Sequence, residues 1–384
     1  MDTDRMFSNI ENLLPTIRAR APEMEQLRRM PADLVGKLRE TRMFAMTVPR
    51  VLGGDEARPV DIMRAIEMVA TADGSTGWCA MIATANNVAS GYMTESGARE
   101  VFADPSAPSA GIAAPAGKAV RVDGGVRVSG RWPFASGITH CEWAWAGCMV
   151  MENGKPHMTP DGPEIVHVCM PVSDVVIHDT WRVSGLCATG SNDFSTTDIF
   201  VPQQRIFALL NPENHRSEPL YQMPPLALYI FEEVSVSLGI ARRALDDLTE
   251  LAQAKVPSLY SDVLADKAIT QVELARAEAL LGGARSFLYE TVEDMWQTVN
   301  AGRPPSGRQL ALGRIAATQA VETAASVTRT ANTLGGGSSI YSTSSLQRHA
   351  RDAEAITHHF TVTPHTWEEA GRVLLGRKPN VPFF

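Results

Sequence analysis

The feature that most constrains this chain is a change of periodicity that occurs twice along its 384 residues. Up to about residue 104 the apolar residues recur at helical spacing, and from about 108 to 206 they alternate as they do in strands. Beyond Pro224 long helical stretches return. We therefore predict an α+β protein with an N-terminal helical domain (1–106), a central antiparallel β-barrel or sandwich (107–206) and a C-terminal helical bundle (207–384).

Local signals mark individual elements. Asp123-Gly124-Gly125 stands between two alternating segments and is typical of a β-hairpin. Within the first zone, helices are predicted over Met24–Thr41, Val60–Thr71, Thr76–Met93 and Ser96–Phe102. In the last zone we expect helices over 344–360 and 363–375, the latter with Thr363 as its N-cap.

Two series of small or apolar residues run along the predicted C-terminal helices. One is an alanine stripe: Leu312, Ala316, Ala320, Ala324, Val327 and Ala331. The other comes earlier: Leu264, Ala268, Val272, Ala275 and Ala279. Small residues let helices approach closely, so the alanine stripe predicts either the inside of a bundle or a subunit interface.

Composition excludes several kinds of partner. Hydrophobic residues make up 44 % and charged residues 20 % of the chain, as in ordinary globular proteins. The net charge of −8 and the lack of a basic run argue against nucleic acid and membrane as partners. No secretory signal and no apolar stretch of about 18 residues is present, so we expect a cytoplasmic protein. Neither the five cysteines nor the histidines show metal-ligand spacing, so no metal site is expected.

The most informative local motif is Gly130-Arg131-Trp132-Pro133-Phe134-Ala135-Ser136-Gly137-Ile138-Thr139-His140, at the end of a predicted strand. It combines a flat apolar surface, a small hydroxyl group and backbone amides beside glycines. A planar redox ring can use all three, because an aromatic side chain can cover its face while a hydroxyl or amide bonds its polar edge. From the residues alone, a strand with a buried Trp132 and a tight turn is the alternative.

A second motif lies far along the chain: Arg351-Asp352-Ala353-Glu354-Ala355-Ile356-Thr357-His358-His359-Phe360. Histidines can carry protons in catalysis, although a lone helical histidine is more often a packed or surface residue. The preceding Gly335-Gly336-Gly337 run lacks the Gly-Lys-Ser/Thr ending of a phosphate-binding loop. No dinucleotide fingerprint follows a predicted strand, so we expect no nicotinamide site.

The order of the three zones and these motifs resemble the acyl-CoA dehydrogenase fold over nearly the full length. The resemblance implies a C-terminal four-helix bundle and a flavin cofactor. It implies that Trp132 or Phe134 covers the isoalloxazine face and that Ser136 bonds N5 or O4. The flavin-binding residues implied in this way are Trp132, Phe134, Ala135, Ser136, Gly137, Gly335 and Gly336.

One departure from the dehydrogenases indicates a different chemistry. In many acyl-CoA dehydrogenases a catalytic glutamate follows the Arg-Asp pair at the position of Phe360, where this chain offers His358 and His359 but no carboxylate. A histidine beside this position, together with Trp-x-Phe-x-Ser-Gly, resembles the oxygenase components of two-component flavin-dependent monooxygenases. The resemblance implies His359 as the base, with His358 as the weaker candidate, and Ser136 as the catalytic residue on the flavin side.

The same resemblance implies a substrate side lined by Trp78, Asn86 and His358. Trp78 stands near the start of a predicted helix, where an ordinary core role is the alternative. Monooxygenase relatives often carry a histidine near the position of Asn86, and this chain departs from that pattern. An amide can bond a substrate atom but cannot act as a base, so Asn86 would assist while His359 alone accepts the proton.

The implied reaction is hydroxylation of an electron-rich aromatic substrate, of the phenol or indole type, through a flavin C4a-hydroperoxide. Its cofactors would be O2 and reduced flavin, FADH2 or FMNH2. A separate NAD(P)H:flavin reductase would supply the reduced flavin by diffusion. The resemblance also implies a homotetramer assembled through the C-terminal bundle, with the glycine turn reaching a neighbour's flavin.

Two other functions stay open on the sequence alone. A flavin dehydrogenase or oxidase of the acyl-CoA dehydrogenase or nitroalkane oxidase type would need a carboxylate base that the sequence does not place. A non-catalytic flavin- or ligand-binding scaffold would need no base at all. Direct reduction of bound flavin by a thioester would indicate the first, and absence of turnover with any aromatic compound the second.

Overall fold

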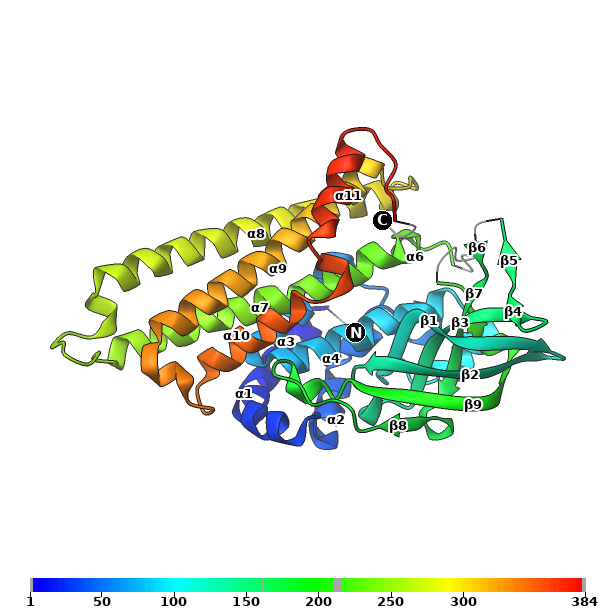
Figure 1. Cartoon of the computed structure of the whole chain (residues 1–384), viewed down its shortest axis with the longest axis horizontal. Coiled ribbons are helices and arrows are strands. Elements are labelled where there is room, and N and C mark those ends of the chain that lie inside the picture. The colour runs from blue at the N-terminus through cyan, green and yellow to red at the C-terminus, as the bar shows by residue number, and fades with distance from the viewer. Residues whose placement is uncertain (1–2, 161, 210–215, 382–384) are drawn as a thin grey trace.

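The structure is a computed structural model that describes residues 3–160, 162–209 and 216–381. Helices come first, strands second and long helices last (Figure 1). The N-terminal helices are α1 (Thr3–Leu27), α2 (Ala32–Thr41), α3 (Pro59–Ala72), α4 (Gly74–Asn87) and α5 (Glu95–Val101). The main strands are β1 (Ser109–Val122), β2 (Gly125–Ala135), β3 (Trp143–Glu152), β7 (Ile165–Pro171), β8 (Val176–His178), β9 (Asn192–Pro202) and β10 (Ile206–Phe207). The C-terminal helices are α6 (Pro219–Gln222), α7 (Pro225–Ala254), α8 (Ala268–Asn300), α9 (Gly307–Leu334), α10 (Ser345–Ile356) and α11 (His365–Leu374).

The start of the chain differs from the expectation of one helix over Met24–Thr41, which is wrong. Helix α1 begins at Thr3, includes Pro15 and Pro22, and ends at Leu27. Arg28 follows with φ of 54°, a left-handed conformation that ends the helix, and α2 begins only after Pro31. Tertiary packing outweighs the two prolines, because α1 buries an apolar stripe against α3.

The strands form one open sheet in the order β10-β7-β3-β1-β2-β9-β8. The predicted hairpin is present, since Val122 pairs with Gly125 across a turn in which Gly124 has a φ of 78°. The expected all-antiparallel pairing is wrong at one place, where β1 and β3 run parallel. The pairing order does not return on itself, so the described strands do not close into a barrel.

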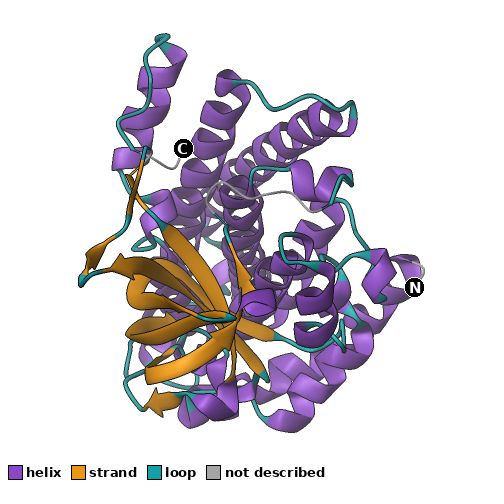
Figure 2. Ribbon diagram, turned by 90° about the vertical axis from the view of Figure 1, so that its right-hand side faces the viewer, coloured by secondary structure: helices purple, strands orange, loops and turns teal. Residues whose placement is uncertain are grey.

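Two of the three buried apolar clusters account for the helical and β layers. A large cluster joins the N-terminal helices to α7, α8, α9 and α10, so both helical zones share one interior. A smaller cluster fills the β-layer around Trp132 and Phe194. Figure 2 shows the strands gathered on one side of the molecule with helices packed against them. The domain limits at 106/107 and 206/207 stay a prediction.

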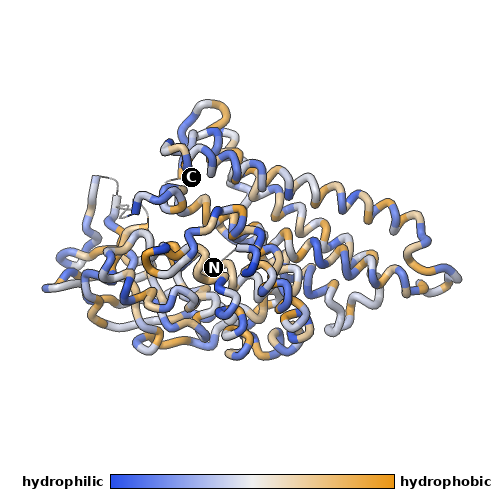
Figure 3. Tube along the Cα trace, turned by 180° about the vertical axis from the view of Figure 1, so that it is seen from behind, coloured by the Kyte–Doolittle hydropathy of each residue, from blue (hydrophilic) through white to orange (hydrophobic). Residues whose placement is uncertain are grey.

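The C-terminal bundle uses the alanine stripe internally. Ala316, Ala320 and Ala324 on α9 are buried, and α9 packs against α7, α8 and α10. Of the other predicted series, Leu264 is buried in the turn before α8, whereas the four members on α8 are exposed, with Val272 at 46 %. Figure 3 shows hydrophilic and hydrophobic residues interspersed along the long helices. The unpartnered apolar face in the described chain is therefore on α8 and not on α9.

Helix α10 ends at Ile356, earlier than the expected limit of 360, so His358 and His359 lie in the turn that follows. The expected cap of the last helix is wrong as well. Helix α11 begins at His365, Pro364 occupies its N-cap position, and no side chain caps it. Within the ranges that the structure describes, no helix has both the length and the apolar character needed to cross a membrane.

Candidate active site

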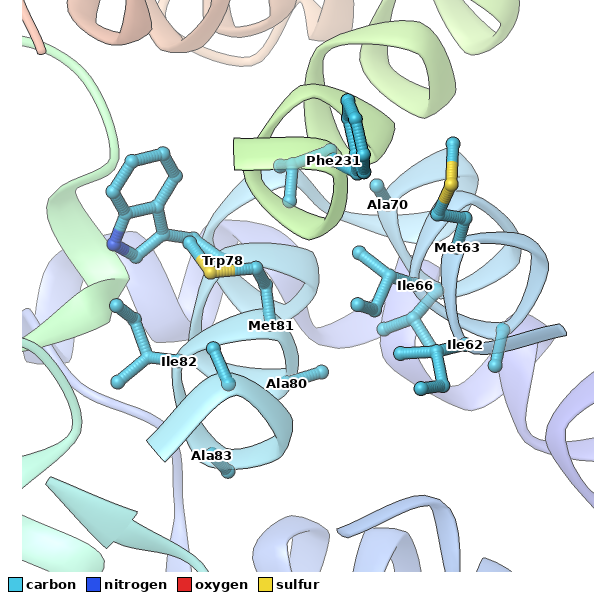
Figure 4. Close-up of a cluster of buried hydrophobic side chains, with 14 of the residues drawn as sticks. Ile62, Met63, Ile66, Ala70, Trp78, Ala80, Met81, Ile82, Ala83 and Phe231 are labelled. Atoms are coloured by element: carbon cyan, nitrogen blue, oxygen red, sulfur yellow. The ribbon is translucent and has the colours of Figure 1, made fainter. Parts of the chain in front are cut away.

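Helix α4 carries Trp78 into the interior between the helices and the β-layer. The Asp73 carboxylate caps the helix by accepting a hydrogen bond from the amide of Thr76 at 2.8 Å. Every residue of α4 is buried, so the position of Trp78 is fixed by packing on all sides. Figure 4 shows Trp78 projecting from α4 on the side away from Ile66 and Met63 of α3.

A chain of buried hydroxyl groups begins at Trp78. Its indole Nε1 donates to Ser136 Oγ at 3.0 Å, and Ser136 Oγ lies 2.7 Å from Ser191 Oγ. Ser191 Oγ in turn lies 2.6 Å from the hydroxyl of Thr189. Ser136 is only 5 % exposed. The cluster places a polar group at the end of β2 inside an otherwise apolar region.

The loop that supplies Thr189 and Ser191 is held by α10. Leu186 donates its amide hydrogen to Asp352 Oδ1 at 2.6 Å. A Cβ atom at Gly185 would lie 2.2 Å from the carbonyl oxygen of Arg351, so only glycine permits this approach. Burial raises the pKa of Asp352 to about 7, with Asp73 adding to the effect. The loop after β8 is thereby fixed to the helix that leads to His359, and it contributes to the site as well as to the fold.

His359 lies directly beside Trp78. Their ring centroids are 5.8 Å apart at an interplanar angle of 72°, an edge contact, and Tyr229 of α7 stacks on the imidazole at 5.9 Å and 27°. The His359 side chain is 23 % exposed. The structure therefore brings together Ser136, Trp78 and His359, which come from three distant parts of the sequence.

Behind His359 lies a carboxylate that the sequence analysis missed. His359 Nδ1 is 2.6 Å from Thr361 Oγ1 and 3.0 Å from Glu233 Oε1, and Thr361 Oγ1 donates to Glu233 Oε2 at 2.6 Å. Glu233 is fully buried on α7. A signal was present, because Glu232 and Glu233 interrupt the apolar run of α7, and an acidic pair there must find buried partners.

Phe134 is the exposed aromatic residue of the strand motif. It is 66 % exposed, has a φ of 64° and meets Trp181 edge-on at 6.2 Å. Trp132 pairs with Phe194 and Ala135 with Asn192, so β2 contains one extra residue between these pairs. This bulge separates the directions of the Phe134 and Trp132 side chains.

The expectation that Trp132 covers a flavin face is wrong. Trp132 is fully buried, stacks on Phe194 at 5.1 Å and donates Nε1–H to the carbonyl oxygen of Gly147 at 2.8 Å. It belongs to the core of the β-layer, where its single polar atom is satisfied. Ala135 is also fully buried. Gly137 has a φ of 75°, and a Cβ there would lie 2.8 Å from the His140 ring.

Asn86 and Asn87 join the end of α4 to the start of β1. Asn86 is 2 % exposed and its amide donates to the carbonyl oxygen of Ser109, while the neighbouring Asn87 bonds Phe44, Ala107 and Ser109. The structure gives Asn86 this structural contact, and its role beside the substrate stays a prediction.

The remaining predicted residues lie apart from Ser136. His358 is exposed and lines a surface groove between α9 and α10 that also includes Arg329 and Arg351. Gly335 and Gly336 lie in the turn after α9, where the ammonium of Lys255 donates to Ser338 Oγ at 2.9 Å. That turn packs against α9 and α10, so within this chain it does not join the Ser136 cluster.

These residues fit a planar redox ring in part. Phe134 offers an exposed ring, and the hydroxyls of Ser136 and Ser191 offer polar groups close by. The amide of Ser136 is engaged, since it donates to the carbonyl oxygen of Phe134 at 2.8 Å, so the hydroxyl is the group left for a ring edge. Phe134 combines a strained backbone conformation with a largely exposed side chain. Both features suit a residue whose ring packs on a planar apolar ligand.

Comparison with known proteins identifies the family. The acyl-CoA dehydrogenase N-terminal domain matches residues 13–102, and the acyl-CoA dehydrogenase C-terminal domain matches residues 233–364. Indole-3-acetate monooxygenase of Pseudomonas putida is 32 % identical over 94 % of this chain and 91 % of its own. The oxygenase subunit HsaA, a flavin-dependent monooxygenase of Rhodococcus jostii (strain RHA1), is 31 % identical over 77 % of this chain and 78 % of its own.

Among solved structures, 3-HSA hydroxylase from Rhodococcus sp. RHA1 superposes with a TM-score of 0.92 at 28 % identity and covers 100 % of both chains. The chain is thus a flavoprotein of the acyl-CoA dehydrogenase fold. Within that fold it belongs to the flavin-dependent monooxygenases, as the oxygenase component of a two-component system.

Proposed function

We propose that this protein hydroxylates an electron-rich aromatic compound of the indole or phenol type. The observation that carries the proposal is the contact of His359 with Trp78, whose indole bonds Ser136. A proton acceptor and a hydroxyl on the flavin side are thereby joined through one aromatic ring. The similarity to indole-3-acetate monooxygenase favours an indole-type substrate.

Phe134, Ser136 and Ser191 would hold the flavin. The cofactor, as FADH2 or FMNH2, supplies the activation of O2 that no amino-acid side chain can provide. The exposed ring of Phe134 can pack on a planar face, and the Ser136 hydroxyl, already oriented by Trp78, can bond a polar edge. Burial of the Ser136–Ser191 cluster keeps water away from that edge.

His359 would accept a proton from the substrate. An aromatic carbon is a better nucleophile when the ring's O–H or N–H gives up its proton, and an imidazole within hydrogen-bond reach can take it. Trp78 and Tyr229 hold the His359 ring from two sides, which fixes its orientation. Trp78 would also form part of the substrate wall, since its ring lies between Ser136 and His359.

The reduced flavin would come from a separate NAD(P)H:flavin reductase, as the membership of two-component systems implies. The glycine turn at Gly335 and Gly336 would serve the flavin of a neighbouring copy, because in its own chain it does not join the Ser136 cluster. The exposed apolar residues of α8, Ile269, Val272 and Leu280, would form part of the contact between copies. We propose a homotetramer on these grounds.

A direct assay tests the function. The protein is mixed with reduced flavin and ¹⁸O2, with indole-3-acetate, indole and resorcinol as separate substrates, and products are identified by mass spectrometry. We expect incorporation of one labelled oxygen atom into at least one ring. His359→Ala should bind flavin as the wild type does but hydroxylate more slowly and release more H2O2. No labelled product from any of these compounds, or unchanged coupling in His359→Ala, would contradict the proposal.

Glu233 bears on the alternative dehydrogenase or oxidase function, because it is a carboxylate close to the site. Its Oε2 accepts from Thr361 and its Oε1 faces His359 Nδ1, so it is committed to other side chains. Anaerobic mixing of the oxidised flavoprotein with a thioester or a nitroalkane tests this function. Bleaching of the flavin absorbance by either compound would favour it over hydroxylation.

A further inference from the structure

Thr361 and Glu233 form a closed hydrogen-bond arrangement with one nitrogen of His359, and the proposed reaction gives neither of them a role. Thr361 Oγ1 lies 2.6 Å from His359 Nδ1 and 2.6 Å from Glu233 Oε2. Glu233 is fully buried and Thr361 is fully buried. With both partners out of water, the positions of their hydrogens are decided by the three groups themselves.

When Glu233 is ionised, only one placement of the hydrogens on Thr361 and His359 satisfies all of these hydrogen bonds. A carboxylate can only accept, so the one hydroxyl hydrogen of Thr361 must go to Glu233 Oε2. The Thr361 oxygen then has no hydrogen left for His359 and can only accept one from Nδ1. His359 Nδ1 therefore carries the hydrogen, and in the neutral ring Nε2 is the nitrogen with a free lone pair.

The second carboxylate oxygen is suited to the protonated ring. Glu233 Oε1 lies 3.0 Å from Nδ1 yet forms no directed hydrogen bond with any described residue. A buried oxygen without a hydrogen bond is costly in the resting state, and a positive charge on the adjacent ring offsets that cost. The other ionisable groups around this pair are Glu232 and Tyr229 on α7 and Arg314 on α9, whose charge Glu233 also faces.

The opposite nitrogen is left available. No described residue forms a hydrogen bond with His359 Nε2, although three aromatic rings, those of Trp78, Tyr229 and Phe360, pack around the imidazole. The polar contacts of the ring are all made at Nδ1, so Nε2 is the nitrogen available to a ligand.

We propose that Glu233 and Thr361 are positioning residues that hold His359 in the Nδ1–H form, so that Nε2 accepts the substrate proton. The inference rests on the proposed function of His359 as the base. In the transfer, the O–H or N–H bond of the substrate breaks, its electron pair stays on the substrate, and the proton forms a bond with Nε2. The resulting imidazolium lies 3.0 Å from Glu233 Oε1, and a carboxylate at that distance stabilises it.

The tautomer can be measured without flavin or substrate. The full-length protein is labelled with ¹⁵N-histidine, and His359 is assigned by the signals that His359→Gln removes. In the wild type we expect hydrogen on Nδ1 and none on Nε2. Glu233→Gln should lose this preference, because an amide can donate to Thr361 and allow the hydroxyl to donate to Nδ1 instead. Glu232→Gln is the matched control, since Glu232 is the adjacent buried carboxyl group and bonds Thr84, and it should keep the wild-type signals.

Thr361 supplies a second, independent variant. Thr361→Val removes the bridging hydroxyl and leaves only Glu233 Oε1, 3.0 Å from Nδ1, so it should weaken the preference for Nδ1–H, whereas Thr361→Ser keeps the hydroxyl and should keep the wild-type preference. If circular dichroism shows that Glu233→Gln is unfolded, the two Thr361 variants test the proposed tautomer on their own. Wild-type tautomer signals in Glu233→Gln, or in Thr361→Val, would overturn the inference.

Kinetics separate this inference from the proposed function. Glu233→Gln should lower the rate constant of hydroxylation by roughly 10- to 100-fold while the Kd for reduced flavin stays within about twofold. If the wild type hydroxylates none of the compounds, the proposed function is refuted and the tautomer result still stands. If Glu233→Gln hydroxylates at the wild-type rate, the positioning role is refuted and the proposed function still stands.

Discussion

Trp78 of α4 donates its indole hydrogen to the hydroxyl of Ser136 at the end of β2, at 3.0 Å. The same ring makes an edge contact with His359, which comes from the turn after α10. One side chain thus connects the helical interior, the β-layer and the C-terminal segment. The hydrogen bond between Trp78 and Ser136 orients a hydroxyl group beside the ring that contacts His359.

Trp78→Phe keeps an aromatic ring but removes the donor. Ser136 retains Ser191 as a partner, so the protein should fold with a loss of about 1 kcal/mol of stability. The Ser136 hydroxyl then loses the donor that orients it from the Trp78 side, and hydroxylation should become less efficient. We expect a higher ratio of H2O2 to hydroxylated product, measured with a peroxide assay and chromatography in the same reaction. A ratio equal to that of the wild type would show that the Trp78 donor has no part in the site.

Ser136→Ala tests the hydroxyl itself. Loss of one hydrogen bond to the flavin should weaken binding by roughly tenfold, which corresponds to about 1.4 kcal/mol. The Kd for reduced flavin is measured anaerobically by titration calorimetry. Ser173→Ala, at an exposed serine away from this cluster, is the control and should bind as the wild type does. Equal dissociation constants for Ser136→Ala and the control would remove Ser136 from the cofactor site.

Phe134 allows the aromatic contact and the backbone strain to be separated. Phe134→Ala and Phe134→Gly both remove the ring, so both should weaken flavin binding to the same degree. Glycine adopts the φ of 64° without strain, whereas alanine does not, so Phe134→Gly should be more stable than Phe134→Ala by about 1 kcal/mol. Thermal unfolding and flavin titration of the two variants give both quantities. Tight flavin binding by either variant would argue against Phe134 as the ring contact.

The strand motif at residues 130–140 shows how much of the site could be predicted from the sequence. The sequence predicted that the motif lies at the end of a strand and is a candidate part of the site. It did not decide whether Trp132 or Phe134 is the aromatic residue exposed there. Alternation places residues two apart on the same face of a strand. The extra residue between the Trp132 and Ala135 pairs breaks that rule, and nothing local in the sequence announces a bulge. The larger aromatic residue is in the core, and the smaller one is exposed.

The C-terminal motif shows the same limit in another form. The absence of a glutamate at Phe360 directed attention to His359, and the structure places His359 against Trp78. Its partner Glu233 lies 126 positions earlier in the chain, and only the packing of α7 against the C-terminal segment brings the two together. The periodicity of a helix or strand predicts contacts within that element, whereas the contact between His359 and Glu233 depends on the tertiary structure. The hydrogen bond from the Asn86 amide to the start of β1 is another contact that depends on tertiary structure.

We expect the substitution Glu232→Gln to change the pH dependence of the protein's stability. Burial raises the pKa of Glu232 to about 8, whereas an exposed glutamate titrates near pH 4.3. Between these values the folded protein keeps a proton that the unfolded chain has lost, so stability falls as pH rises through this window. At pH 5 the carboxyl group is neutral and resembles the amide of glutamine, so the two proteins should have similar Tm values.

At pH 8 the wild type has lost that contribution and the variant has not. The Tm of Glu232→Gln should therefore exceed that of the wild type by an amount that grows from pH 5 to pH 8, reaching the order of a few kcal/mol in unfolding free energy. Subtraction of the two curves removes the parallel effect of Asp352, whose pKa is also raised by burial. Glu11→Gln, at an exposed glutamate of α1, should show no such divergence. Parallel Tm curves for Glu232→Gln and the wild type would mean that Glu232 is ionised in the folded state, held by a partner stronger than the hydroxyl of Thr84.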